Sequence, residues 1–168
     1  EWVTTLILAI TKIMQAPDGT LYVSESACQI SCVKWFRTVY RSFALYLWSI
    51  PNGGKRGGKT NKHGQSIEAA IMKAEGLTSG VADLMLSLAR SGLHGLYIEM
   101  KTPVGQWDKD QRAFAERQIA EGYGYALCPT QNDFEKAVTL YMQNKYVQAP
   151  IEKIGKKQQG KFIAYIAD

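Results

Sequence analysis

The sequence is poor in cysteine, and this shortage argues against two classes of protein. Its three cysteines, Cys28, Cys32 and Cys128, are an odd number without the spacing of a disulfide framework, which speaks against a disulfide-stabilised secreted scaffold. Cys28 and Cys32 lie four residues apart in a helical pattern, but no partner residues for a zinc site lie near them. We therefore expect all three cysteines to be small core residues in a reducing cytoplasm.

The sequence also lacks a hydrophobic run long enough to cross a membrane. The apolar segment at residues 2–10 is too short to span a bilayer, and it lacks the basic start of a signal peptide. We expect this segment to form a strand or a packing arm, and we expect no membrane partner. The sequence contains no internal repeats, and its only biased tract is the glycine- and lysine-rich stretch at residues 50–64.

What the sequence does contain is typical of one globular domain. The chain has 168 residues, of which 46% are hydrophobic and 21% are charged, and it is long enough to bury a core. Its net charge of +5 favours an anionic partner. The basic residues are concentrated in the glycine-rich stretch and in the C-terminal tail. They are Lys55, Arg56, Lys59, Lys62, Lys153, Lys156, Lys157 and Lys161.

Hydrophobic spacing and capping residues predict a mixed α/β chain. After a polar turn at Pro17-Asp18-Gly19, the pattern predicts helices at 25–41, 66–75, 108–121 and 132–144, and strands at 44–50, 81–88, 95–101 and 123–128. The expected helix caps are Ser24, Ser66, Asp108 and Asn132, with Gly76 and Gly122 just past two helix ends. Because the two middle strands form a hairpin, this order predicts a mixed sheet covered by helices on both faces rather than a doubly wound array.

The first predicted helix places polar residues in line with apolar ones. Glu25, Gln29, Cys32, Phe36 and Tyr40 share one stripe, so Glu25 and Gln29 continue the buried face at its N-terminal end. A buried carboxylate needs a cation or another partner. The alternative is that Glu25 only complements the helix dipole, as acidic residues in a first turn often do.

The predicted hairpin brings two acids together. Side chains alternate along a strand, so Glu99 and Lys101 point to one face. A turn centred on Ser91 pairs Asp83 directly with Glu99, although both lie within apolar runs. Two facing carboxylates repel each other and raise one pKa, and a divalent metal removes this conflict. The alternative is an ordinary surface pair between an acid and a lysine at a hairpin edge.

The third predicted helix carries a glutamine between aromatic residues. Trp107, Gln111, Phe114 and Gln118 form one stripe, and its aromatic members should face the sheet. Gln111 is therefore either part of the polar site or a buried amide satisfied by backbone groups.

Taken in order, five stretches make the chain resemble the VRR-NUC domain, a branch of the PD-(D/E)XK nucleases. The stretches are ESACQISCVKWF (25–36), IPNGGKR (50–56), KAEGLTSGVADLML (73–86), LYIEMKTPVGQW (96–107) and DQRAFAERQIAEGYGYALC (110–128). The resemblance covers residues 24–144 and is strongest to small stand-alone phage and bacterial members. It implies a restriction-endonuclease-like α/β fold, with an N-terminal arm at 1–23 and a basic tail at 145–168 outside the domain.

The resemblance also implies roles for individual residues. Asp83 and Glu99 would bind Mg²⁺ or Mn²⁺, with Glu25 and the carbonyl of Met100 as further ligands. Lys101 would be the catalytic lysine, and Gln111 the helical glutamine of the motif. The chain departs from the family at Ala82, where a proline usually precedes the hairpin acid; this departure bears on the local rigidity of the segment, whereas the acid itself is present at Asp83.

The implied activity is metal-dependent hydrolysis of DNA that leaves a 5′-phosphate and a 3′-hydroxyl. Stand-alone members resemble structure-selective nucleases that include Holliday-junction resolvases acting as homodimers, so we expect branched DNA and a second copy of the chain as partners. A two-fold dimer presents two active sites to two strands. The alternatives are a non-catalytic nucleic-acid-binding module and a nucleotide triphosphatase.

The triphosphatase alternative rests on the glycine- and lysine-rich stretch. From Gly53 to Gly58, Lys59 and Thr60 it fits a phosphate-binding loop, but the predicted helix begins only near Ser66 instead of at the lysine and threonine. We therefore interpret the stretch as a basic loop that contacts DNA phosphates, with a solvated loop as the alternative. The predicted contact residues are Asn52, Lys55, Arg56, Lys59 and Lys62.

Overall fold

The computed structural model describes residues 13–51, 67–154, 157–158 and 161–162. Its helices are α2 (Glu25–Val39), the 3₁₀ helix η1 (Arg41–Tyr46), α3 (Ile67–Ala74), α4 (Lys109–Ala120) and α5 (Gln131–Met142). Its strands are β1 (Ile13–Gln15), β2 (Leu21–Val23), β3 (Leu47–Ser49), β4 (Leu84–Leu86), β5 (Leu96–Met100), β6 (Gly124–Cys128), β7 (Lys157–Gln158) and β8 (Lys161–Phe162). Within the described ranges, no helix is both long and apolar enough to span a membrane.

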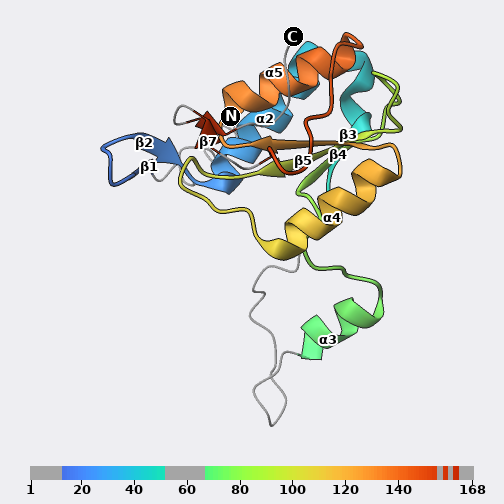
Figure 1. Ribbon diagram of the computed structural model, residues 1–168, viewed down its shortest axis with the longest axis horizontal. Coiled ribbons are helices and arrows are strands. Elements are labelled where there is room, and N and C mark those ends of the chain that lie inside the picture. Colours follow the sequence, from blue (N-terminus) through green and yellow to red (C-terminus); the bar gives the residue numbers. More distant parts are fainter. Residues whose placement is uncertain (1–12, 52–66, 155–156, 159–160, 163–168) are drawn as a thin grey trace.

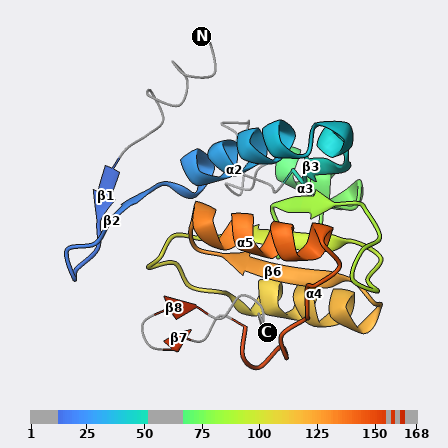
Figure 2. The same ribbon diagram turned by 90° about the horizontal axis from the view of Figure 1, so that it is seen from above.

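A four-stranded sheet forms the centre of the molecule, with strand order β3-β4-β5-β6. The β5–β6 pair is parallel, and the other two pairs are antiparallel. Helices α2 and α5 cover one face of the sheet, and α4 covers the other (Figures 1 and 2). Helix α3 stands away from the sheet below α4 in the view of Figure 1. This is the predicted mixed sheet flanked by helices.

The central hairpin has the predicted register. Leu84 pairs with Ile98 and Leu86 with Leu96, so the pairs are symmetric about Ser91. The turn places Ser91 and Gly92 at positive φ (54° and 72°) and pairs Arg90 with Leu93, which is one position out of step with the ladder, so one extra residue lies between this two-residue turn and the paired strands. The next pair in this register is Asp83 and Glu99, which explains why two distant acids meet.

A smaller apolar cluster around Phe114 and Tyr125 lies on the α4 side of the sheet, and the larger part of the core lies on the face covered by α2 and α5. Phe36 of α2 and Phe134 of α5 are fully buried there, together with Ile98 and Met100 of β5. All three cysteines are buried and unpaired, and Cys28, Cys32 and Cys128 belong to this same core. Their expected role as small core residues is confirmed.

Most of the predicted caps hold, because each is a short-range feature. The Oγ of Ser24 accepts a hydrogen bond from Ala27 N–H and starts α2, and the side chain of Asp108 caps α4. Gly76 and Gly122 take positive φ after α3 and α4, as predicted for residues that end helices.

Several boundaries differ from the prediction, and the strand expected at 81–88 is shortened to Leu84–Leu86. The strand expected at 44–50 begins only at Leu47, and residues 41–46 form η1 instead. Strand β4 ends at Leu86, opposite Leu47, so residues before Leu47 have no strand to pair with. The cap of α5 is Thr130 rather than Asn132, because the Oγ1 of Thr130 accepts from Asp133 N–H and its backbone is extended.

The chain outside the central sheet adds a hairpin that the sequence pattern did not predict. Strands β1 and β2 pair antiparallel around the predicted turn, in which Gly19 has φ of 86°. This hairpin projects from the body of the molecule near the start of α2 (Figure 2). The predicted N-terminal strand or arm at 2–10 lies outside the described residues.

Candidate active site

The C-terminal end of β5 carries the candidate site. Because side chains alternate along the strand, Ile98 and Met100 enter the apolar core while Glu99 lies on the opposite face. Glu99 is 1% exposed, and within the described residues it is the only buried charged side chain. A buried carboxylate is costly unless donors or cations surround it, so the neighbours of Glu99 define the site.

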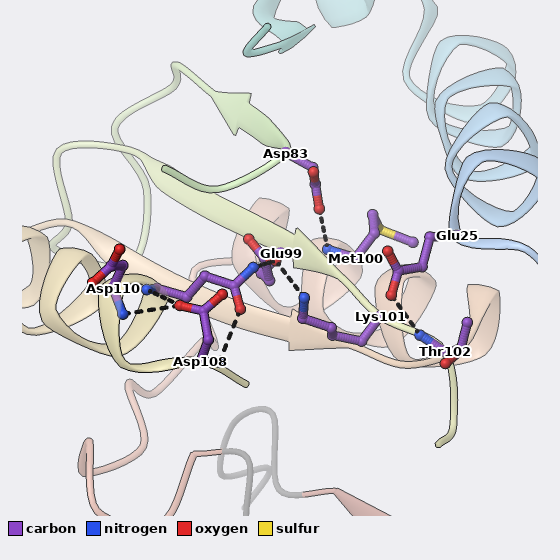
Figure 3. Close-up of polar contacts among 9 residues, drawn as sticks. Glu25, Asp83, Glu99, Met100, Lys101, Thr102, Asp108 and Asp110 are labelled. Atoms are coloured by element: carbon purple, nitrogen blue, oxygen red, sulfur yellow. Dashed lines mark hydrogen bonds and ion pairs between the residues drawn. The ribbon is translucent and has the colours of Figure 1, made fainter. Parts of the chain in front are cut away.

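Asp83 reaches this place from the neighbouring strand. It directly precedes β4, and its backbone carbonyl accepts a hydrogen bond from Ile50 N–H (2.8 Å). Its Oδ2 accepts from Met100 N–H at 2.9 Å, which ties the acid to the end of β5 (Figure 3). The predicted approach of Asp83 to Glu99 therefore rests on both the hairpin register and a hydrogen bond.

Two donors bind one oxygen of Glu99. The ammonium of Lys101 lies 3.2 Å from Oε1 of Glu99, and the side-chain amide of Gln111 donates to the same oxygen. The other oxygen, Oε2, is buried and has no hydrogen-bond partner among the described residues. The carboxylate is thus held by one oxygen and leaves the second available.

The first turn of α4 fixes Gln111. The Oδ1 of Asp108 accepts from the N–H groups of Asp110 and Gln111, both at 2.9 Å, while Oε1 of Gln111 accepts from Asp108 N–H at 3.2 Å. This capping box orients the Gln111 amide so that its nitrogen points at Glu99. Gln111 lies between half-buried Trp107 and buried Phe114, as its predicted stripe requires.

A glycine sets how closely the segment before Asp83 approaches α4. Gly80 has φ of 77°, and a Cβ at this position would collide with the backbone of Asp110. The backbone of Gly80 therefore packs directly against the first turn of α4. This contact fixes the helix start relative to Asp83.

The charges around Glu99 set its protonation. Burial, followed by the charge of Asp83, raises the pKa of Glu99 to about 8, and Lys101 opposes this rise. Glu25 adds a smaller upward contribution to the same pKa, so its carboxylate also acts on the site. The site thus gathers more negative charge than Lys101 balances.

Glu25 occupies a different position from the predicted one. Its side chain is exposed, so the expectation that it continues the buried face of α2 is wrong, and Gln29 is only half-buried. The Oε1 of Glu25 instead accepts from Thr102 N–H at 3.2 Å, just past the end of β5 (Figure 3). The first turn of α2 extends beyond the part of the helix that packs on the apolar core. Glu25 therefore lies next to the polar residues at the C-terminal end of β5.

Two polar residues that the sequence analysis did not assign to the site lie beneath Glu99. The Nε1 of Trp107 and the hydroxyl of Tyr125 are buried without a hydrogen-bond partner among the described residues, and their rings lie 5.8 Å apart. Burial and the charge of Glu99 hold the pKa of Tyr125 well above its ordinary value, while the adjacent indole of Trp107 opposes this rise. Trp107 was visible in the helical stripe, whereas Tyr125 lies in an apolar strand pattern that gave no signal.

The donors at the end of β5 fit a divalent cation with oxygen ligands. Oε2 of Glu99 is buried without a partner and belongs to a carboxylate that a second acid, Asp83, repels, and a cation between the two acids relieves both conditions. In the ranges that the structure describes, no three His, Cys, Asp or Glu side chains are grouped closely enough to hold an ion. A cation here would take few carboxylates, and backbone oxygens and water would complete its shell.

The predicted DNA-contacting residues follow strand β3 in the sequence. Asn52, Lys55, Arg56, Lys59 and Lys62, and with them the phosphate-loop pattern, lie outside the described residues. Helix α3 begins at Ile67, one residue after the predicted cap. Strand β3 ends next to Ile50, which bonds to Asp83, so the chain enters the basic stretch from beside the site.

Comparison with solved structures identifies the fold. A chain described as a VRR_NUC domain protein superposes with a TM-score of 0.59, covering 73% of this chain and 90% of that chain at 22% sequence identity. No family model matches the sequence, and no curated protein matches it. The chain therefore has a VRR-NUC-like fold, which is a restriction-endonuclease-like arrangement of a mixed sheet between helices.

Proposed function

We propose that residues 24–144 form a metal-dependent, structure-selective DNA endonuclease. The observation that carries this proposal is the buried carboxylate of Glu99, which lies beside Asp83 and Lys101 at the end of a central hairpin. A fold needs no such group for stability, because a buried charge destabilises it. The VRR-NUC-like fold supports a nuclease, since the structure it resembles carries that domain name.

In this proposal Asp83 and Glu99 hold Mg²⁺ or Mn²⁺, with the Met100 carbonyl and Glu25 as further ligands. The bound cation would lower the pKa of water and neutralise charge on the phosphate. Oε2 of Glu99 is the free ligand oxygen, while the Met100 N–H fixes the Asp83 carboxylate beside it. Hard oxygen donors favour these two ions over zinc.

Lys101 and Gln111 complete the proposed site. Lys101 is 13% exposed at its side chain and is held by Glu99, so its remaining ammonium protons can orient a water or bind a phosphoryl oxygen. Gln111 holds Oε1 of Glu99 from the opposite side and so acts as a positioning residue. Hydrolysis adds water across the phosphodiester and leaves a 5′-phosphate and a 3′-hydroxyl.

The proposed substrate is branched DNA, including four-way junctions, and the proposed active form is a homodimer. A net charge of +5 supports an anionic substrate. Cleavage of both strands at a junction requires two sites related by a two-fold axis. The basic stretch from Asn52 to Lys62 remains the predicted contact to the DNA backbone.

Cleavage assays on junction, flap and linear duplex DNA at fixed salt test the proposal. We expect cleavage with Mg²⁺ or Mn²⁺ and none with a chelator. Asp83→Ala and Lys101→Ala should each reduce the rate by about a thousand-fold, or about 4 kcal/mol. Glu116→Ala and Lys136→Ala, which remove exposed charges of the same kinds, serve as matched controls and should keep the wild-type rate. Unchanged cleavage in both site variants would falsify the proposal.

A DNA-binding module without catalysis is the competing function, and metal binding separates the two. Isothermal titration with Mn²⁺ should show heat for the wild-type chain and its loss in Glu99→Ala. If both chains bind DNA with a steep salt dependence but neither binds Mn²⁺, the acids are structural and the chain is a binding module.

A further inference from the structure

A groove with a volume of about 740 Å³ lies between one face of α2 and the edge strand β3. On the α2 side its lining residues recur every three or four positions, including Ile30, Lys34 and Arg37, and so share one face of the helix. This face is distinct from the buried stripe that contains Cys32 and Phe36. The opposite wall is β3, which has no neighbouring strand on its outer side in the four-stranded sheet.

The groove is basic. Lys34, Arg37 and Arg41 line it with exposed side chains, and none of its described lining residues is acidic. In the described part of the chain, none of these three cations forms a salt bridge. Three unpaired cations along one groove create a positive potential that an anion with repeated charges matches.

The groove begins beside the candidate active site. Helix α2 starts at Glu25, which bonds to Thr102 N–H, and on the other wall Ser49 is followed by Ile50, which bonds to Asp83. At 1.5 Å per helical residue, Lys34 lies roughly 14 Å from Glu25 along the helix axis and Arg37 roughly 18 Å. These distances correspond to roughly four or five nucleotides of a DNA strand, at about 3.4 Å each.

We propose that this groove binds the backbone of the DNA strand on one side of the cleaved bond. This inference rests on the proposed nuclease function and adds the path of the substrate. Lys34, Arg37 and Arg41 pair with successive phosphates. Contacts of this kind position a DNA strand without reading its sequence. Trp48, which also lines the groove, donates its indole N–H to Ser87 Oγ (3.2 Å) and is 46% exposed, so it offers a fixed ring for base stacking.

A binding assay without metal tests the groove separately from catalysis. The triple variant Lys34→Ala/Arg37→Ala/Arg41→Ala is compared with Arg117→Ala/Lys136→Ala/Lys145→Ala, which removes the same charge from exposed positions elsewhere. Anisotropy of a fluorescent four-way junction is measured with chelator between about 50 and 200 mM salt. Alanine is the best helix former, so the variant keeps α2, and circular dichroism checks this.

We expect the groove variant to bind DNA at least about ten-fold more weakly and to flatten the salt dependence by about two to three in log–log slope, at about 0.9 for each phosphate contact. The control triple variant should change both quantities much less. Equal loss in the two triple variants overturns the proposal, because the effect is then one of net charge. Wild-type binding by the groove variant, or no binding by the wild type, also overturns it.

A second measurement locates the contact on the strand. Replacing one phosphate at a time by a neutral methylphosphonate should weaken wild-type binding at positions about four to seven nucleotides from the cleaved bond, and should add little in the groove variant. If the losses of binding free energy from the methylphosphonate and from the groove substitutions simply add at every position, the proposal is contradicted. If the groove variant differs from the wild type in the sedimentation coefficient of the free protein but not in its affinity for DNA, the groove binds a second copy of the chain instead. If the wild-type chain binds DNA through the groove but does not cleave it, the nuclease proposal fails and the groove proposal stands.

Discussion

The two faces of β5 are built from alternate residues of one strand, and only one of them carries a buried charge. Toward α2 and α5, Ile98 and Met100 lie in a core of aliphatic, aromatic and cysteine side chains. Toward α4, Glu99 lies among a lysine, a glutamine and a second acid. One face of this strand thus serves the fold alone, whereas the other combines an apolar cluster around Tyr97 with the candidate chemistry at Glu99, because successive side chains point in opposite directions.

The tyrosines of the molecule show the same contrast. The hydroxyl of Tyr141 donates to Leu88 O at 2.6 Å, and that of Tyr146 donates to Tyr125 O at 2.9 Å. The hydroxyl of Tyr125 itself, on the α4 side, has no hydrogen-bond partner among the described residues. The unsatisfied buried polar atoms of the described residues are Oε2 of Glu99, Nε1 of Trp107 and the hydroxyl of Tyr125, and such atoms call for an explanation that the fold alone does not give.

The largest expected effect on stability comes from the core face. Phe36→Ala removes a fully buried ring from between α2 and the sheet, and should lower the free energy of unfolding by about 3–5 kcal/mol. Urea denaturation measures this difference. Val39→Ala, at the exposed end of the same helix, is the matched control and should change stability by less than about 0.5 kcal/mol. Equal effects would contradict the assignment of this face as the core.

On the α4-facing side of β5, the buried Glu99 should instead lower the free energy of unfolding, and by an amount that depends on pH. Glu99 has a pKa of about 8 in the folded chain, above that of an ordinary carboxyl, so the folded chain binds more protons than the unfolded chain between about pH 4.5 and pH 8. The free energy of unfolding therefore falls as the pH rises through this window, by at most about 1.4 kcal/mol per pH unit. Below the window both states are protonated and the effect vanishes.

Glu99→Gln removes this titration, and so the variant should gain stability relative to the wild type as the pH rises. Thermal or urea unfolding of metal-free protein at pH 5 and pH 8 measures the difference. Glu116→Gln, at an exposed position of α4, should show no such trend. A stability difference between Glu99→Gln and wild type that does not change with pH would contradict the raised pKa.

Helix caps should have a smaller effect, and they distinguish the structure from the sequence prediction. Thr130→Ala removes the hydroxyl that accepts from Asp133 N–H and should cost about 1 kcal/mol. Asn132→Ala, at the predicted cap, should leave stability unchanged or raise it by a few tenths of a kcal/mol, because this exposed residue lies inside α5 and alanine is the better helix former. Urea denaturation of the two variants decides between them, and a larger loss for Asn132→Ala would restore the predicted boundary.

The smallest effect is expected beneath Glu99. Tyr125→Phe removes a hydroxyl that has no partner among the described residues, so stability should stay within about 0.5 kcal/mol of wild type or rise slightly. Tyr141→Phe, which breaks a buried hydrogen bond to Leu88 O, should cost about 1 kcal/mol. If Tyr125→Phe costs as much as Tyr141→Phe, its hydroxyl has a partner that stabilises the fold.

The features that sequence reasoning predicted are those set by neighbouring residues. The register of β4 and β5 agrees with the prediction and brings Asp83 to Glu99, although the turn itself is offset by one residue, and the start of α4 follows from Asp108. The contact of Glu25 with Thr102 could not be predicted, because it depends on how far α2 extends past the sheet. The unpartnered hydroxyl of Tyr125 was equally hidden, since a strand pattern does not show which polar atoms find donors.

The close packing of Gly80 against Asp110 has a consequence for engineering. Two backbone segments meet there without a side chain between them, and one leads to Asp83 while the other holds Gln111. No rotamer change can absorb an error in this contact. Residues 80–83 and 108–111 therefore have to be transferred together when this arrangement is grafted onto another scaffold, and a chimera that takes only one of them will misplace Asp83 relative to Gln111, the residue that holds Glu99.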